Sequence, residues 1–104
     1  MKLTIKDRLV IGNLYPKEGD ILTQLLVKSI KEKVRITEEE IKEIQLRKFP
    51  NGNISYQTDR AKELLVDFTE DELTVLKQQV EKLDKQKKVT QSLVDLCIKI
   101  KEAK

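Results

Sequence analysis

Apolar residues recur at helical spacing most regularly between residues 68 and 88. Thr69 stands before this run as a candidate N-cap, and Glu72 completes a capping box three residues later. Four apolar residues follow at spacings of three, four and three, which places them on one helical face: Leu73, Leu76, Val80 and Leu83. Acidic residues open the run and lysines close it, in the order that the helix dipole favours. The pattern predicts one long helix with one face to be covered.

The same capping pattern predicts two shorter helices. Thr4 with Asp7 begins the first, which we expect to end near Gly12 to Tyr15. Thr37 with Glu40 begins the other.

Between these two, Asp20 is a suitable N-cap for a helix with the sequence ILTQLLVKSIKEKV. We expect this helix to be buried at its start and solvated at its end, because its apolar residues come first and its cations last. Four cations form its basic tail: Lys28, Lys31, Lys33 and Arg35. Cations at a helix C-terminus are stabilising in their own right, so we favour this interpretation over a phosphate-binding patch.

Residues 44 to 58 alternate in polarity and enclose the turn sequence FPNG. This pattern predicts a β-hairpin with a type I turn and Gly52 in the left-handed position of a G1 bulge. The register places Lys48 opposite Ile54 and brings four apolar side chains to one face: Ile44, Leu46, Ile54 and Tyr56.

Residues 63 to 68 alternate as well, with Leu64, Val66 and Phe68 at every second position. They predict either a third strand or an extended lead-in to the long helix. In both cases the small sheet needs cover on its apolar face, and the neighbouring amphipathic helix is expected to provide it.

The segment QSLVDLCIKI predicts a last helix that is apolar nearly all round and therefore enclosed. Thr90 is its candidate N-cap, and the turn before it is short, so the last two helices should form an antiparallel hairpin. The chain, residues 1–104, is thus expected to be a single α+β domain, mainly helical. It combines N-terminal helices, a small antiparallel β-hairpin or three-stranded sheet, and a C-terminal helical hairpin.

Composition argues against enzyme chemistry. The chain has no histidine, which removes the commonest general base and the commonest zinc ligand. Cys97 lies within an apolar helix and is interpreted as a core thiol. Glu38, Glu39 and Glu40 are consecutive, so on a helix they point in different directions and do not converge on one ion. We therefore expect no catalytic residue, no metal site and no cofactor.

The chain also lacks a secretory signal at its start and an apolar run long enough to cross a bilayer. A cytoplasmic location without membrane insertion is expected.

Nucleic-acid binding is the alternative function. The net charge of +3 is too small to argue it alone. A second basic set near the end of the long helix would supply phosphate contacts: Lys82, Lys85, Lys87 and Lys88. Glu81 and Lys85 form an ordinary i, i+4 pair, however, which favours a solvated helix surface. The segment VTQSLVDL resembles the opening of a helix-turn-helix, but no second helix of useful length follows it.

Three parts of the chain together resemble small uncharacterised proteins encoded by tailed phages and prophages. They are the opening LTIKDRLVIGNLYPKEGDILT, the hairpin after ITEEEIKE, and the strand followed by FTEDEL and the KLDKQKKVT turn. The resemblance implies an origin and an accessory or host-interaction role, without an activity. The leading hypothesis is a non-enzymatic protein-interaction or accessory module, whose partner is an unknown protein or a second copy of the chain.

Overall fold

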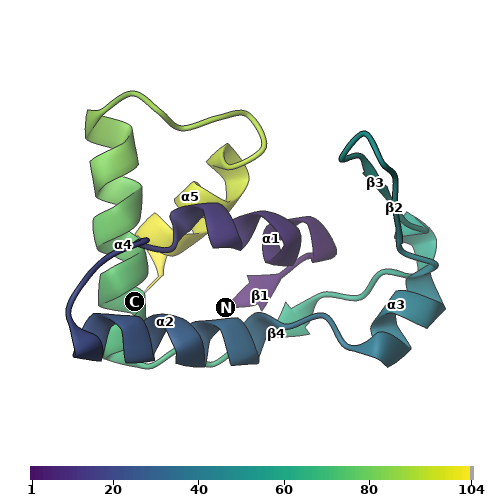
Figure 1. The fold of residues 1–104 in the computed structure, drawn as a ribbon, viewed down its shortest axis with the longest axis horizontal. Helices are drawn as coiled ribbons and strands as arrows, with labels where there is room; N and C mark the ends of the chain where they lie inside the picture. Colours follow the sequence, from purple (N-terminus) through teal and green to yellow (C-terminus); the bar gives the residue numbers. More distant parts are fainter. Residues whose placement is uncertain (104) are drawn as a thin grey trace.

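The computed structural model describes residues 1–103 of the chain. It is an α+β fold, mainly helical, with two small antiparallel sheets (Figure 1). The elements follow in this order: β1 (Lys2–Leu3), α1 (Ile5–Val10), η1 (Ile11–Leu14), α2 (Ile21–Val34), α3 (Glu38–Ile44), β2 (Arg47–Lys48), β3 (Ile54–Ser55), η2 (Thr58–Arg60), β4 (Leu64–Leu65), α4 (Glu70–Lys85) and α5 (Val94–Glu102).

Local side-chain caps begin four of the five α-helices, as predicted. Complete capping boxes precede α1, α3 and α4. At α4 the Glu72 N–H donates to Thr69 Oγ1 at 3.2 Å, and the Thr69 N–H donates to Glu72 Oε1 at 2.8 Å. At α2 the Asp20 carboxylate accepts from the Thr23 N–H at 2.8 Å. These four helix starts are therefore determined by residues within three positions of each other.

The predicted cap of the last helix is wrong. The Thr90 carbonyl accepts from the N–H groups of Leu93 and Val94, both at 3.0 Å, but its side chain does not cap the helix. Residues 86–93 form a turn-containing connector, which is longer than predicted. Beyond it α5 packs against α4, so the helical hairpin itself is confirmed (Figure 1).

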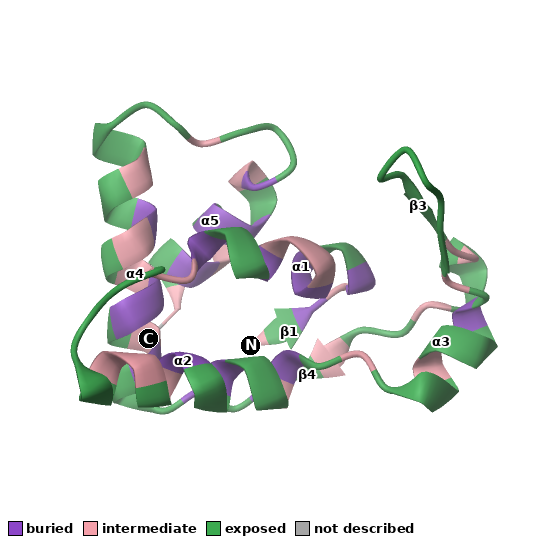
Figure 2. Ribbon diagram, viewed as in Figure 1, coloured by how far each residue is buried: buried purple, intermediate pink, exposed green. Residues whose placement is uncertain are grey.

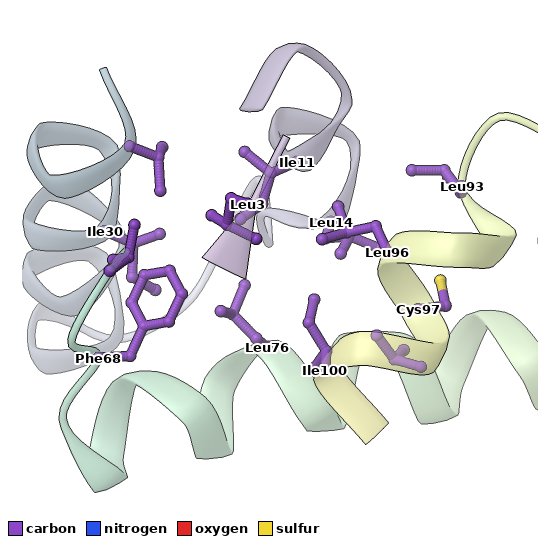
Figure 3. Close-up of a cluster of buried hydrophobic side chains, with 13 residues drawn as sticks. Leu3, Ile11, Leu14, Ile30, Phe68, Leu76, Leu93, Leu96, Cys97 and Ile100 are labelled. Carbon is purple, nitrogen blue, oxygen red and sulfur yellow. The ribbon is translucent and has the colours of Figure 1, made fainter. Parts of the chain in front are cut away.

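The core lies where α2, α4 and α5 meet the segment from β1 to η1 (Figure 3). Leu76 in the middle of α4 is fully buried, and Val80 one turn on is also buried. Leu73 and Leu83 are partly buried and pack against the same cluster, so the predicted apolar face of α4 is covered. Thirteen residues form the buried cluster: Leu3, Ile11, Leu14, Ile30, Val34, Val66, Phe68, Leu76, Val80, Leu93, Leu96, Cys97 and Ile100.

A strand does form within residues 63–68, but its partner is the start of the chain. β4 pairs antiparallel with β1, with Lys2 opposite Leu65 and Leu3 opposite Leu64. The Val66 N–H continues this pairing by donating to the Met1 carbonyl at 2.8 Å. The structure therefore has two separate two-stranded sheets instead of one sheet built on the hairpin.

The hairpin has the predicted register and turn. Lys48 lies opposite Ile54, Gly52 has a positive φ of 87°, and the Gly52 N–H donates to the Phe49 carbonyl at 2.9 Å. The expectation that a helix covers its apolar face is wrong, because residues 47–55 are exposed throughout and the hairpin projects to one side (Figures 1 and 2). The long helix is unavailable as cover because α2 and α5 already pack against it.

The expected burial of α2 is reversed. Its start is exposed, with Ile21, Leu22 and Leu25 facing solvent, whereas Ile30 and Val34 near its end belong to the core. The physical reason is the position of α4, whose first turn contacts the end of α2 through the ion pair described below. The spacing of apolar residues predicts which face of a helix is apolar, but it does not predict whether neighbouring elements cover the first or the second half of that face.

Candidate functional site

A buried arginine joins three helices at one side of the molecule. Arg8 on α1 donates through Nε to the Val34 carbonyl at 2.9 Å and through Nη2 to the Arg35 carbonyl at 2.5 Å. These carbonyls belong to the last turn of α2, where a helix leaves acceptors without partners. The same guanidinium forms a two-pronged ion pair with the Glu40 carboxylate on α3, at 2.5 and 2.9 Å. Arg8 thereby fixes α3 relative to α1 and α2.

This ion pair changes the acidity of Glu40. The hydrogen bonds from Arg8 lower the pKa of the Glu40 carboxyl to about 2, against partial burial, which acts to raise it. The carboxylate also accepts from the Thr37 N–H at 3.1 Å. One side chain therefore caps α3 and connects it to the arginine.

Directly beside this junction lies an open groove of about 380 Å³, which we call the basic groove. It lies between the α1–η1 segment, the end of α2, and α3 with the first strand of the hairpin. Its lining is mainly apolar, and four of its six aliphatic side chains remain partly accessible: Leu9, Ile36, Ile41 and Leu46. The groove is lined by Arg8, Leu9, Ile11, Gly12, Tyr15, Lys31, Val34, Arg35, Ile36, Ile41, Leu46 and Lys48.

The only aromatic ring in the groove is already in contact with a cation. The Nζ of Lys31 lies 5.6 Å from the centre of the Tyr15 ring, within the range of a cation–π interaction. Burial raises the pKa of the Tyr15 hydroxyl to about 12. Tyr15 therefore stays neutral at physiological pH and serves as an apolar wall.

The charges that line the groove have one sign. Four basic side chains and no acidic one are among its lining residues. Arg8 is paired with Glu40, whereas Lys31, Arg35 and Lys48 take part in none of the ion pairs found within residues 1–103. The groove thus carries three unneutralised positive charges around an apolar floor.

The structure divides the predicted basic tail of α2. Lys31 and Arg35 line the basic groove, and Lys28 is exposed on the outer face of α2. Lys33 points elsewhere, where its Nζ donates to Glu72 Oε1 at 2.5 Å and to the Asp67 carbonyl at 3.0 Å. Lys33 is therefore a structural cation that connects the end of α2 to the start of α4.

Glu72 is buried, and its charge is retained through its partners. Burial opposes ionisation, but hydrogen bonds from Lys33 and from the Thr69 N–H outweigh it and lower the pKa. The nearby Ser29 hydroxyl also lowers the pKa of Glu72. Its geometry is not that of a regular hydrogen bond, and within residues 1–103 the Glu72 Oε2 atom has no such bond. A capping residue thus also forms the ion pair that fixes α4 against α2.

The second predicted basic set lies at the far end of α4. Its four lysines are exposed, and Lys85 is 3.4 Å from Glu81, as the i, i+4 spacing predicted. Thirteen residues separate Lys85 from Glu72, which amounts to roughly 20 Å along the helix at 1.5 Å per residue. Because Lys33 contacts Glu72, the two basic sets lie at opposite ends of α4 and do not form one surface. Lys82, Lys87 and Lys88 remain surface cations beside Lys85.

A second exposed surface is the apolar patch at the start of α2. Ile21, Leu22 and Leu25 are 82%, 64% and 57% exposed, respectively. They lie on adjacent turns of the same helix, and we call them the α2 apolar patch. Such a cluster on one helix face marks a surface that another molecule can cover.

The groups that suggest chemistry in the sequence lie apart. Cys97 is buried in the core, and burial, together with the negative charge of Asp84, raises the pKa of its thiol, which disfavours the reactive thiolate. Among residues 1–103, no three histidine, cysteine, aspartate or glutamate side chains converge as metal ligands would. Within the same range no helix is long and apolar enough to span a membrane.

Comparison with known proteins adds no family to this description: no protein-family model, curated protein or solved structure matches the chain.

Sequence reasoning identified Lys31 and Arg35 as basic candidates but missed two charged residues that connect distant elements, Arg8 and Asp7. The local pattern gives Arg8 no role and Asp7 only a capping role, although the Asp7 carboxylate also accepts from Lys99 Nζ at 2.6 Å. The available signal was weak: an arginine beside the capping residue of a short amphipathic helix. The partners of both residues lie far along the chain, so local spacing does not reveal them.

Proposed function

We propose that this protein is a non-enzymatic protein-interaction module that associates with a second copy of itself through the α2 apolar patch. The observation that carries the proposal is the exposure of Ile21, Leu22 and Leu25 in a chain whose other helices direct most of their large apolar side chains inward. Covering three large aliphatic side chains removes apolar area from water, which favours association.

The charges that flank the patch favour a second copy of this chain as the partner. Asp20 lies just before the patch, and hydrogen bonding from Thr23 lowers its pKa, so it is negative at neutral pH. Lys28 lies just after the patch on the same exposed face of α2. Two α2 helices packed antiparallel about a two-fold axis would place Asp20 of each copy near Lys28 of the other while the patches meet.

The patch is small, so the association should be weak. Three side chains supply much less than the roughly 1,200 Å² of buried surface found in stable interfaces. We expect a reversible dimer that is populated at high micromolar concentration and dissociates on dilution.

Sedimentation velocity over a broad range of concentration tests the proposal. The sedimentation coefficient should rise with concentration for the unaltered protein, and Leu25→Lys should abolish the rise. Ile98→Lys on α5 is the matched control, because Ile98 is also an exposed helical residue, at 48%, and lies outside the patch. A protein that remains monomeric throughout, or equal loss in both variants, would overturn the proposal.

The resemblance to phage and prophage proteins supports an accessory role for such a module, and the cytoplasm remains its expected location. Nucleic-acid binding has less support, because the basic residues predicted for it lie in separate places, and two of them, Lys33 and Lys85, already form ion pairs.

A further inference from the structure

We propose that the basic groove is a second binding site, which takes an acidic peptide segment carrying apolar side chains. The site is separate from the α2 apolar patch, and the inference does not depend on self-association. It rests on three observations: an apolar floor, an unneutralised positive rim, and a geometry fixed by buried hydrogen bonds.

The floor of the groove offers apolar contact from several elements. Leu9 comes from α1, and Ile41 comes from α3. Ile36 lies just before α3, and Leu46 lies just before the hairpin. These side chains are partly accessible, Ile41 the most at 37%. A volume of about 380 Å³ is within the range of pockets that hold small ligands or one or two side chains of a peptide. The floor therefore suits an aliphatic or aromatic anchor.

The rim determines the charge of the partner. Lys31, Arg35 and Lys48 approach the groove from α2 and β2, and no carboxylate lines it. Because Arg8 beneath them is already paired with Glu40, an incoming anion meets three cations without a carboxylate partner, of which Lys31 also lies over the Tyr15 ring. Electrostatic complementarity of this kind selects acidic partners and speeds their encounter.

A single strand of nucleic acid fits the groove less well than an acidic peptide does. Proteins that bind single strands stack bases on exposed aromatic rings along a basic channel. Tyr15 is the only aromatic residue lining the groove, it is half-buried, and Lys31 lies over its ring. The aliphatic floor offers contact to apolar side chains but no ring on which a base could stack.

The walls of the groove that α1, α2 and α3 form are preorganised. Arg8 connects α1, the end of α2 and the start of α3 through four hydrogen bonds. Binding therefore costs less ordering of the protein than it would at a surface made of free loops.

The test uses three pools of labelled peptides of one length. The first pool combines acidic residues with leucine and phenylalanine. The second has lysine in place of the acidic residues, and the third has serine in place of the apolar residues. A labelled single-stranded oligothymidylate is the nucleic-acid probe. Binding is measured by fluorescence anisotropy on the full chain, and amide chemical shifts locate the contact. We expect the acidic apolar pool alone to bind, and to shift the amides of Arg35, Ile41 and Leu46.

The double variant Arg35→Glu with Lys48→Glu should weaken this binding by about tenfold or more. The control, Lys82→Glu with Lys88→Glu, makes the same change in net charge at the far end of α4 and should bind as the unaltered protein does. Circular dichroism confirms folding of both variants. Equal weakening in the two variants, tighter binding of the oligonucleotide, or shifts confined to other surfaces would overturn the proposal. Leu25→Lys should leave peptide binding unchanged, which separates this test from that of self-association.

Discussion

Replacing Arg8 with methionine removes every hydrogen bond that the Arg8 guanidinium donates at the junction of α1, α2 and α3, while keeping an unbranched apolar stem. The Arg8 guanidinium has four contacts, two to the carbonyls of Val34 and Arg35 and two to the Glu40 carboxylate. In the variant the carbonyls lose a charged donor, and the carboxylate keeps its charge without its partner.

The expected cost can be worked out from these contacts. Hydrogen bonds to charged groups contribute about 1.5 to 3 kcal/mol each, and breaking a buried ion pair by removing one partner costs about 3 to 5 kcal/mol. The Glu40 side chain is 31% exposed, so water replaces part of what it loses, and the methionine adds apolar contact. We therefore expect Arg8→Met to lower the free energy of unfolding by about 3 kcal/mol.

Urea denaturation at neutral pH, followed by circular dichroism, measures this change through the transition midpoint. Arg8→Lys should give an intermediate loss, because lysine keeps the charge but not the planar fork that reaches a carboxylate and two carbonyls together. Glu40→Gln should cost less than either, since the carbonyl contacts survive.

A double-mutant cycle between Arg8→Met and Glu40→Gln isolates the ion pair. The two changes should be non-additive by about 1 kcal/mol or more, because they remove the same interaction. A loss below about 1 kcal/mol in Arg8→Met would refute the assignment of Arg8 as the residue that fixes these three helices. Strict additivity in the cycle would refute the contribution of the ion pair.

Three further predictions test the core, the caps and the effect of pH. Leu76→Ala should lower the free energy of unfolding by about 2 to 5 kcal/mol in urea denaturation because Leu76 is fully buried, whereas Leu22→Ala on the exposed patch should change it by less than about 0.5 kcal/mol. Thr69→Ala should cost about 1 kcal/mol through the lost cap of α4, and Thr69→Ser, measured in the same way, should restore most of it. The pKa of Glu40 is lowered from 4.5 to about 2 in the folded protein. The ionised carboxylate therefore stabilises the fold fully at pH values above its ordinary pKa, and this stabilisation is lost as the pH falls through the pKa of the folded protein. Denaturation midpoints should therefore fall between pH 5 and 2, and Glu40→Gln should flatten that fall; parallel curves for the two proteins would contradict it.

The helix starts could be predicted because their causes are local. Thr4, Thr37 and Thr69 each form a hydrogen bond with the residue three positions on, so a short stretch of sequence contains the whole interaction. The hairpin register was predictable for the same reason, since the turn around Gly52 determines it.

The β1–β4 pairing, the groove and the exposed patch could not be predicted because their causes are distant in the sequence. Lys2 and Leu3 are too few residues to show a strand pattern, and their partner strand begins 61 residues after Leu3, at Leu64. The spacing of α2 predicted an apolar face correctly, but only the position of α4 decides that Ile30 is covered and Leu25 is not. Likewise, nothing adjacent to Arg8 indicates that Val34, 26 residues later, supplies an acceptor for its side chain.

The contact between the start of the chain and α5 has a consequence for how the chain folds as it is synthesised. Asp7 bonds to a lysine 92 residues further along, and contacts across such sequence distances form late because a long loop must first close. Translation adds roughly 5 to 20 residues per second, so the segment before α2 waits for seconds until α5 has left the ribosome. During that interval the cluster that contains Leu3, Ile11 and Leu14 lacks the cover that Leu96 and Ile100 of α5 supply. A nascent chain halted before α5 should therefore be a better substrate for holding chaperones than the finished protein.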